Sequence, residues 1–154
     1  MTIYIGSDHR GFEMKGRLIP FIKEMGHEVI DLGNTVYDEH DDYPLIAAKI
    51  AKEVSANQAS RGVILCGSGG GVNIVANKFP RVRSNLGLSP IQVYAARRDD
   101  DSNVLCLAAS FMTEDQERES IKTFLTTEFS GEERHKRRLG QIETLEKENF
   151  ASGL

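Results

Sequence analysis

Five short apolar segments of strand length recur along the chain, and segments with helical periodicity separate them. The strand-like segments are 3–5, 28–30, 63–65, 84–88 and 104–107. The helical segments are 11–25, 44–55, 71–78, 90–98, 114–127 and 131–148. Because parallel strands need long crossover connections, usually helices, this alternation predicts an α/β fold with a doubly wound, parallel sheet of five strands.

Length and composition restrict the classes of protein that this chain can belong to. With 154 residues, 40% of them hydrophobic and 27% charged, the sequence predicts a single globular domain over 1–154. A net charge of −4 argues against nucleic-acid binding. No run of 18 apolar residues and no basic leader is present, so we expect a cytoplasmic chain that makes no membrane contact. Cys66 and Cys106 lie in separate apolar segments, which argues against a disulfide or a zinc site.

The densest glycine cluster directly follows the third strand-like segment. It consists of Cys66 and then Gly67, Ser68, Gly69, Gly70 and Gly71. Doubly wound sheets bind ligands beyond the carboxyl ends of their strands, and backbone N–H groups at a helix start bind anions and favour thiolate. We therefore expect Cys66 to act as a base while these amides hold an enediolate, which suits proton abstraction beside a carbonyl. The spacing matches neither a dinucleotide-binding motif nor a Walker loop.

Other candidate groups stand at the end of the first strand-like segment and near the carboxyl terminus. Asp8 and His9 follow the first strand, which is often the neighbour of the third in such sheets, so we expect them to share a crevice with Cys66 and Ser68. Arg134 and Arg138 are spaced four residues apart in a helical segment, so they share a helix face, and guanidinium groups suit phosphate oxygens.

Five segments together resemble the ribose-5-phosphate isomerase B family, which also includes galactose-6-phosphate and allose-6-phosphate isomerases. They are "GSDHRGFEMK", "DDYP", "CGSGGGVNIVANKFPRVR", "DSNVL" and "GEERHKRRL". The resemblance runs from residue 3 to about 145 in the family's order. It implies a Rossmann-like three-layer domain that forms a homodimer with shared active sites, and it leaves open whether dimers pair into a tetramer.

The resemblance also implies a reaction and roles for the candidate residues. The reaction is the isomerisation of phosphorylated sugars, most directly of ribose 5-phosphate to ribulose 5-phosphate, without metal or organic cofactor. Cys66 is implied as the base between C1 and C2, Ser68 as a proton shuttle, and Asp8 as a contact near the anomeric end. The loop amides would hold the enediolate. His9, Arg134 and Arg138 are implied as phosphate ligands, with the helix of about 131–148 reaching to the partner subunit.

One pair of residues departs from the family pattern. Asp99 and Asp100 stand where the ribose enzymes usually carry His-Asn, of which the histidine is assigned to ring opening and the asparagine faces the sugar. A carboxylic acid with an ordinary pKa near 4 is a poor proton donor at neutral pH. Three readings stay open: turnover of ribose 5-phosphate without this histidine, a tetrose or hexose phosphate as substrate, or a non-catalytic homologue that binds sugar phosphates. We interpret His40, Asp41 and Asp42 as loop residues.

Overall fold

The computed structural model describes residues 1–151, in which five strands and their crossover helices follow the predicted order. The strands are β1 (Thr2–Ser7), β2 (Glu28–Asp31), β3 (Arg61–Cys66), β4 (Ser84–Gly87) and β5 (Val104–Ala108). The helices are a 3₁₀ turn η1 (His9–Gly11), α1 (Phe12–Glu24), α2 (Tyr43–Ala56), α3 (Gly70–Ala76), α4 (Pro90–Asp100), α5 (Glu114–Thr126) and α6 (Glu133–Ala151). The predicted α/β alternation is confirmed.

The five strands form one parallel sheet in the order β2-β1-β3-β5-β4. From β1 the chain goes to β2 on one side, then crosses to β3 on the other side, continues to the edge strand β4 and returns to β5 between β3 and β4. The switch point of the sheet therefore lies between β1 and β3, where a doubly wound fold leaves a crevice for a ligand. The prediction that the first and third strands are neighbours is confirmed.

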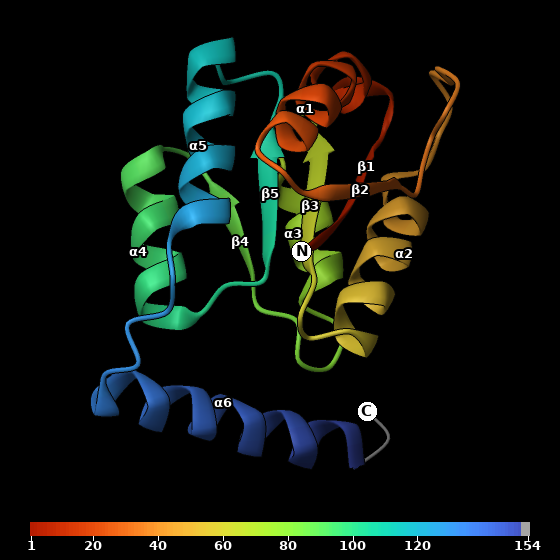
Figure 1. Ribbon diagram of the computed structural model, residues 1–154. Helices are drawn as coiled ribbons and strands as arrows, with labels where there is room; N and C mark the ends of the chain where they lie inside the picture. The colour runs from red at the N-terminus through yellow and green to blue at the C-terminus, as the bar shows by residue number, and fades with distance from the viewer. Residues whose placement is uncertain (152–154) are drawn as a thin grey trace.

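Helices cover both faces of the sheet and make the predicted three layers (Figure 1). On one face α1, α4 and α5 pack on the side chains of Ile5, Leu65 and Leu107. On the other face α2 and α3 pack on residues that include Ile64 and Cys106. The near-continuous apolar runs of β3 and β5 are buried on both faces, as parallel central strands require.

Local sequence signals account for where several helices begin. Thr113 and Gln116 form the predicted capping box at α5, in which each side chain accepts the other residue's backbone N–H. The expected helix over 11–25 is observed as α1, and the turn η1, which Asp8 caps, precedes it. This turn brings Asp8 and the residues after it back over the end of β3.

Because all strands run in one direction, the sheet has a carboxyl edge, where the strands end, and an amino edge, where they begin. The crossover helix α4 runs back across the sheet and ends at the amino edge, just before β5 begins. Helix α6 also lies across the amino edge, opposite the strand tips (Figure 1). None of the helices within residues 1–151 is long and apolar enough to cross a membrane.

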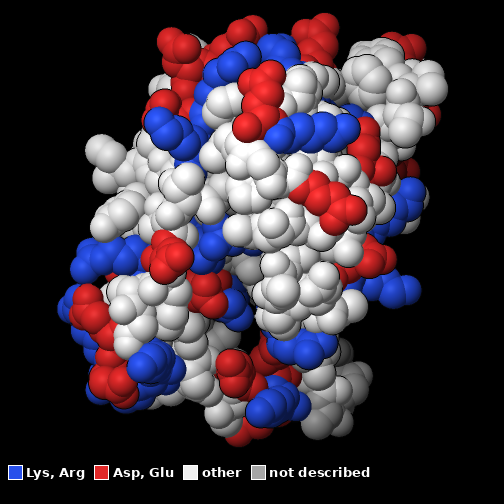
Figure 2. All heavy atoms as spheres, in the orientation of Figure 1, with Lys and Arg blue, Asp and Glu red and all other residues white. Residues whose placement is uncertain are grey.

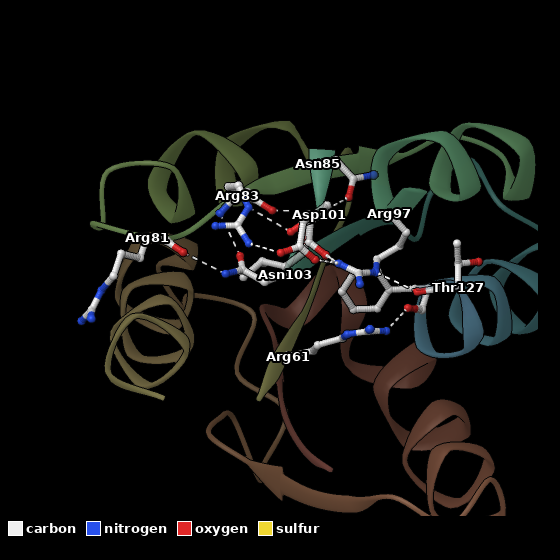
Figure 3. Close-up of polar contacts among 11 residues, drawn as sticks. Arg61, Arg81, Arg83, Asn85, Arg97, Asp101, Asn103 and Thr127 are labelled. Carbon is white, nitrogen blue, oxygen red and sulfur yellow. Dashed lines mark hydrogen bonds and ion pairs between the residues drawn. The ribbon is translucent and has the colours of Figure 1, made fainter. Parts of the chain in front are cut away.

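A polar network centred on Asp101 anchors the end of α4 (Figure 3). Asp101 has a left-handed backbone with φ of 45°, and its carboxylate binds Arg97 at 2.9 Å and Arg83 at 2.7 Å. Asn103 accepts the backbone N–H of Arg83 and donates to the carbonyl of Arg81, each at 2.8 Å. Asp101 is thus a structural residue that determines where the two residues before it lie.

A groove separates most of α6 from the body of the molecule. It has a volume of about 750 Å³, and Lys78, Arg83 and Asn85 line it on the body side, facing Ile142 and Leu145 of α6. Figure 2 shows the gap near the base of the molecule, among interspersed basic and acidic side chains. Both oxygens of Glu146 accept the backbone N–H of Arg81, at 2.8 and 2.9 Å, which ties α6 to the body.

Candidate active site

Asp8 and Cys66 meet at the switch point between β1 and β3. Asp8 follows β1, and its Oδ1 accepts the backbone N–H groups of Arg10 at 3.0 Å and Gly11 at 3.1 Å. Its Oδ2 accepts the thiol proton of Cys66 at 2.8 Å. Both side chains are nearly buried, with 4% of Asp8 and 8% of Cys66 exposed. A carboxylate and a thiol therefore share one proton beside the glycine loop.

The pKa of the Cys66 thiol is raised to about 11, whereas the sequence predicted that the loop would lower it. Burial of the sulfur is the largest cause, and Asp8 adds to it by accepting the thiol proton and by its negative charge. Hydrogen bonds from the backbone of Gly69 and Gly67 act in the predicted direction but are outweighed. The prediction was wrong in sign because it considered the loop without the carboxylate that the neighbouring strand supplies.

The glycine loop needs its glycines for packing as well as for backbone shape. Gly69 has φ of 71°, and a Cβ there would lie 2.5 Å from Leu86 Cδ1. At Gly67 a Cβ would lie 3.2 Å from Arg10 Nε, so the Arg10 side chain runs alongside the loop. Ser68 is exposed at the turn, and its Oγ accepts the Gly70 N–H at 3.4 Å. The loop thus packs against the sheet while Ser68 stays accessible.

Tyr43 is a residue at this edge to which the sequence reasoning gave no role. A Cβ on Gly71 would lie 2.6 to 2.8 Å from the tyrosine ring and hydroxyl, so the ring packs directly against the glycine loop. The "DDYP" segment that carries Tyr43 was part of the family resemblance. A close tyrosine at this position adds an aromatic wall and a hydroxyl group to the crevice.

Asp41 is a second residue to which the sequence analysis gave no role, because it was interpreted as a loop residue. Its side chain is only 6% exposed, and Oδ1 lies 2.8 Å from His9 Nδ1. The same oxygen accepts the backbone N–H of His9 at 3.1 Å. His9 is therefore held at the carboxyl edge, next to Asp8, as the sequence predicted.

The remaining predicted site residues lie at the opposite edge of the sheet. Asp99 and Asp100 are the last residues of α4, and Arg134 and Arg138 are exposed on α6. The end of α4 and the whole of α6 lie at the amino edge, whereas β3 ends with Cys66 at the carboxyl edge (Figure 1). The single chain thus presents two separate groups of candidate site residues, one at each edge of the sheet.

The amino-edge group contains a histidine that the sequence reasoning did not single out. His135 is buried, and its Nδ1 lies 2.8 Å from Ser130 Oγ and 3.6 Å from Asp99 Oδ1. That Asp99 oxygen is buried and has no hydrogen-bond partner among residues 1–151. Arg98 also approaches Asp99, at 3.8 Å. Asp99 therefore lies between an imidazole and a guanidinium.

Comparison with known proteins identifies the family. A family model described as Ribose/Galactose Isomerase matches residues 3–142. The chain belongs to this family. Within the ribose/galactose isomerase family it is similar to a probable ribose-5-phosphate isomerase B of Mycoplasma pneumoniae, with 39% identity over 95% of each chain. It is also 35% identical to ribose-5-phosphate isomerase B of Mycobacterium tuberculosis, over 98% of this chain and 93% of the relative.

Solved structures of family members have the same fold. The crystal structure of ribose-5-phosphate isomerase B from Mycoplasma genitalium with bound ribulose-5-phosphate matches with a TM-score of 0.92 and 37% identity, over 96% of this chain and 97% of that one. The resemblance inferred from five sequence segments is confirmed, and with it the Rossmann-like α/β fold. As a member of this family the chain is an aldose–ketose isomerase.

Proposed function

We propose that this isomerase interconverts ribose 5-phosphate and ribulose 5-phosphate through a cis-enediolate, without a metal or an organic cofactor. The observation that carries the proposal is the Cys66–Asp8 pair beside the glycine loop, at the switch point of the sheet. The pentose phosphate is supported by the relative from Mycoplasma genitalium, whose structure contains ribulose-5-phosphate.

The chemistry needs a base whose proton can move. With a pKa of about 11, Cys66 is a thiol at neutral pH, so its proton has to leave before it can accept one from carbon. Asp8 Oδ2, 2.8 Å away, is the acceptor. The thiolate then takes the C2 proton, and the electron pair moves onto the aldehyde oxygen O1 to form the enediolate.

The rest of the cycle returns every proton. Ser68 transfers a proton from O2 to O1, and Cys66 delivers its new proton to C1, which completes the ketose. The thiolate that remains recovers the first proton from Asp8. The loop amides of Gly67, Gly69, Gly70 and Gly71 hold the negative oxygen during these steps.

A complete site requires a second copy of the chain. His9 lies at the carboxyl edge directly after Asp8, the partner of Cys66, whereas the other proposed phosphate ligands, Arg134 and Arg138, lie at the amino edge together with Asp99 and Asp100. A homodimer that places the amino edge of one subunit over the carboxyl edge of the other brings them together. Exposed apolar side chains on α3 and at the start of α4 suit such an interface: Ile74 is 63% exposed and Ile91 82%.

The presence of Asp99 supports a second candidate substrate. It replaces the histidine that the family uses for ring opening, and His135 beside it is buried rather than presented to a substrate. A four-carbon ketose phosphate such as erythrulose 4-phosphate has no usual furanose ring to open. A binder without turnover is less favoured, because binding alone needs no thiol at the glycine loop.

Proton exchange and turnover measured together test the proposed reaction. We expect the enzyme in heavy water to incorporate deuterium at C2 of ribose 5-phosphate, and Cys66→Ala to lose both exchange and turnover by at least about a thousandfold, because the base is removed. NMR and a coupled assay measure the two rates. A Cys66→Ala variant with wild-type exchange would disprove the role of the thiol.

The same assays separate the candidate substrates. A specificity constant that is higher for ribose 5-phosphate than for erythrulose 4-phosphate supports the pentose, and the reverse order supports the open-chain substrate.

Cys106→Ala is the matched control for Cys66→Ala. The Cys106 thiol is fully buried and outside the proposed site, so its loss should leave the rates of deuterium exchange and of turnover unchanged.

A further inference from the structure

The carboxylate of Asp41 is buried, and the contacts of its two oxygens centre on His9. Oδ1 lies 2.8 Å from His9 Nδ1 and 3.1 Å from the His9 backbone nitrogen. Oδ2 accepts the side-chain amide of Asn34 at 2.8 Å. A buried carboxylate is costly unless charged or hydrogen-bonding groups compensate it, and of these three donors only the imidazole can carry a charge.

These contacts determine which ring nitrogen of His9 is available to a ligand. A carboxylate only accepts hydrogen bonds, so Nδ1 must carry a proton and donate it to Asp41. Nε2 is then the ring nitrogen that remains to meet a ligand. Because Oδ1 also holds the His9 backbone N–H, the ring and its backbone are tied to one oxygen, which restricts rotation of the ring.

The loop that carries Asp41 is itself held by a buried cation. Lys15 of α1 donates to the carbonyl of Gly33 at 2.9 Å and also to the carbonyl of Asn34, while Asp31 balances its charge at 2.9 Å. Asn34 in turn holds Asp41. A continuous set of contacts thus leads from α1 through this loop to the imidazole, which is the arrangement expected when a functional side chain is preorganised.

We propose that Asp41 is a positioning residue for phosphate recognition: it orients His9 so that Nε2 donates to the substrate phosphate, and it supplies the counter-charge when the ring binds as an imidazolium. The inference rests on the proposed function, in which His9 contacts phosphate. The imidazolium would then lie between two anions, and both of its hydrogen bonds would be charge-assisted, which makes them stronger than neutral ones.

Asp41→Asn tests this with little change in shape, since the amide oxygen can still accept from Nδ1 and from the backbone. We expect KM for ribose 5-phosphate and the inhibition constant of inorganic phosphate to rise about tenfold each, with kcat within about twofold of wild type. The reason is that a phosphate contact is lost while the Cys66–Asp8 pair is untouched. Unchanged KM and inhibition constants would overturn the proposal, as would a loss confined to kcat.

Two further variants distinguish positioning from general loop stability. Asp38→Asn removes the same charge from the same loop, where the exposed Asp38 carboxylate accepts the His40 backbone N–H at 3.0 Å, and it should change neither constant. In a His9→Asn background, Asp41→Asn should have no further effect on KM, because it acts through the imidazole. Additive losses would contradict the proposal.

Titration with inorganic phosphate, followed by NMR of the His9 ring, separates this inference from the proposed isomerase reaction. If phosphate shifts the His9 signals and binds about tenfold more weakly to Asp41→Asn, the positioning role holds even when no pentose phosphate is turned over. If the enzyme turns over ribose 5-phosphate and phosphate binds both forms equally, the positioning role fails while the function stands.

Discussion

The proton between Cys66 and Asp8 is the central feature at the scale of single residues. Two backbone N–H groups hold one oxygen of Asp8, so its other oxygen points at the sulfur 2.8 Å away. The carboxylate therefore has two opposite effects on the thiol. It accepts the proton that must leave, and its negative charge disfavours the thiolate that results.

Replacing Asp8 separates these effects. In Asp8→Asn the negative charge next to the sulfur is gone, and burial remains as the main cause of the raised pKa, so the pKa of Cys66 should fall below about 11. The rate of alkylation by iodoacetamide as a function of pH measures it. Isomerase activity should nevertheless fall, because the proton acceptor is lost. An unchanged pKa would show that Asp8 does not control the thiol.

At the scale of elements, the position of η1 on β3 determines where Asp8 lies. Gly11 ends this turn, and a Cβ there would lie 2.6 Å from the carbonyl carbon of Leu65, the residue before Cys66. Its φ of −96° is open to any residue, so the requirement for glycine is steric. The close approach of turn and strand brings the carboxylate to the thiol.

Gly11→Ala should therefore destabilise the fold by about 3 kcal/mol, because a methyl group is forced against backbone atoms that cannot move aside. It should also abolish activity by displacing Asp8. Gly16→Ala is the matched control within α1: apart from its chain neighbours and the backbone of α1, no atom of residues 1–151 lies within 4 Å of its Cβ position, so this change should stabilise the helix by up to about 1 kcal/mol. Urea unfolding measures both, and equal effects would contradict the steric argument.

At the scale of the whole molecule, the two site groups lie at opposite edges of one sheet. Helix α4 carries Asp99 and Asp100 to the amino edge, because a crossover helix between parallel strands must return to the edge where the next strand begins. Helix α6, which carries Arg134 and Arg138, follows the last strand and α5 and lies across the same edge (Figure 1). The fold of one chain keeps these groups apart, so assembly is the proposed way to unite them.

Mixing two inactive variants tests that assembly. Cys66→Ala damages the carboxyl edge, and the double variant Arg134→Ala/Arg138→Ala damages the amino edge. Refolded together, about half of the dimers are mixed, and one of their two sites is intact, so activity should return to about a quarter of wild type. Mixtures of Cys66→Ala with Asp8→Asn should not recover, since both changes affect the same edge. An absence of recovery in the first mixture would show that sites are not shared.

Much of the architecture and half of the candidate site followed from local sequence patterns. Strand-length apolar runs, helical periodicity and the Thr113 capping box depend on residues close in the chain, so they could be predicted from it. The pairing of Asp8 with Cys66 at neighbouring strand ends followed from the general geometry of parallel sheets. The five family segments were specific enough to identify the isomerase family.

Only the tertiary structure decided the electrostatics and the division of the site. The raised pKa of Cys66, the pairing of Asp41 with His9 and the burial of Lys15 come from contacts between segments 16 to 58 residues apart. No local pattern reports burial or the charge of a neighbour from a distant segment, because both depend on how the chain is packed. The sequence alone determined which residues this isomerase carries, whereas the directions of its strands and helices decided which of them one chain can bring together.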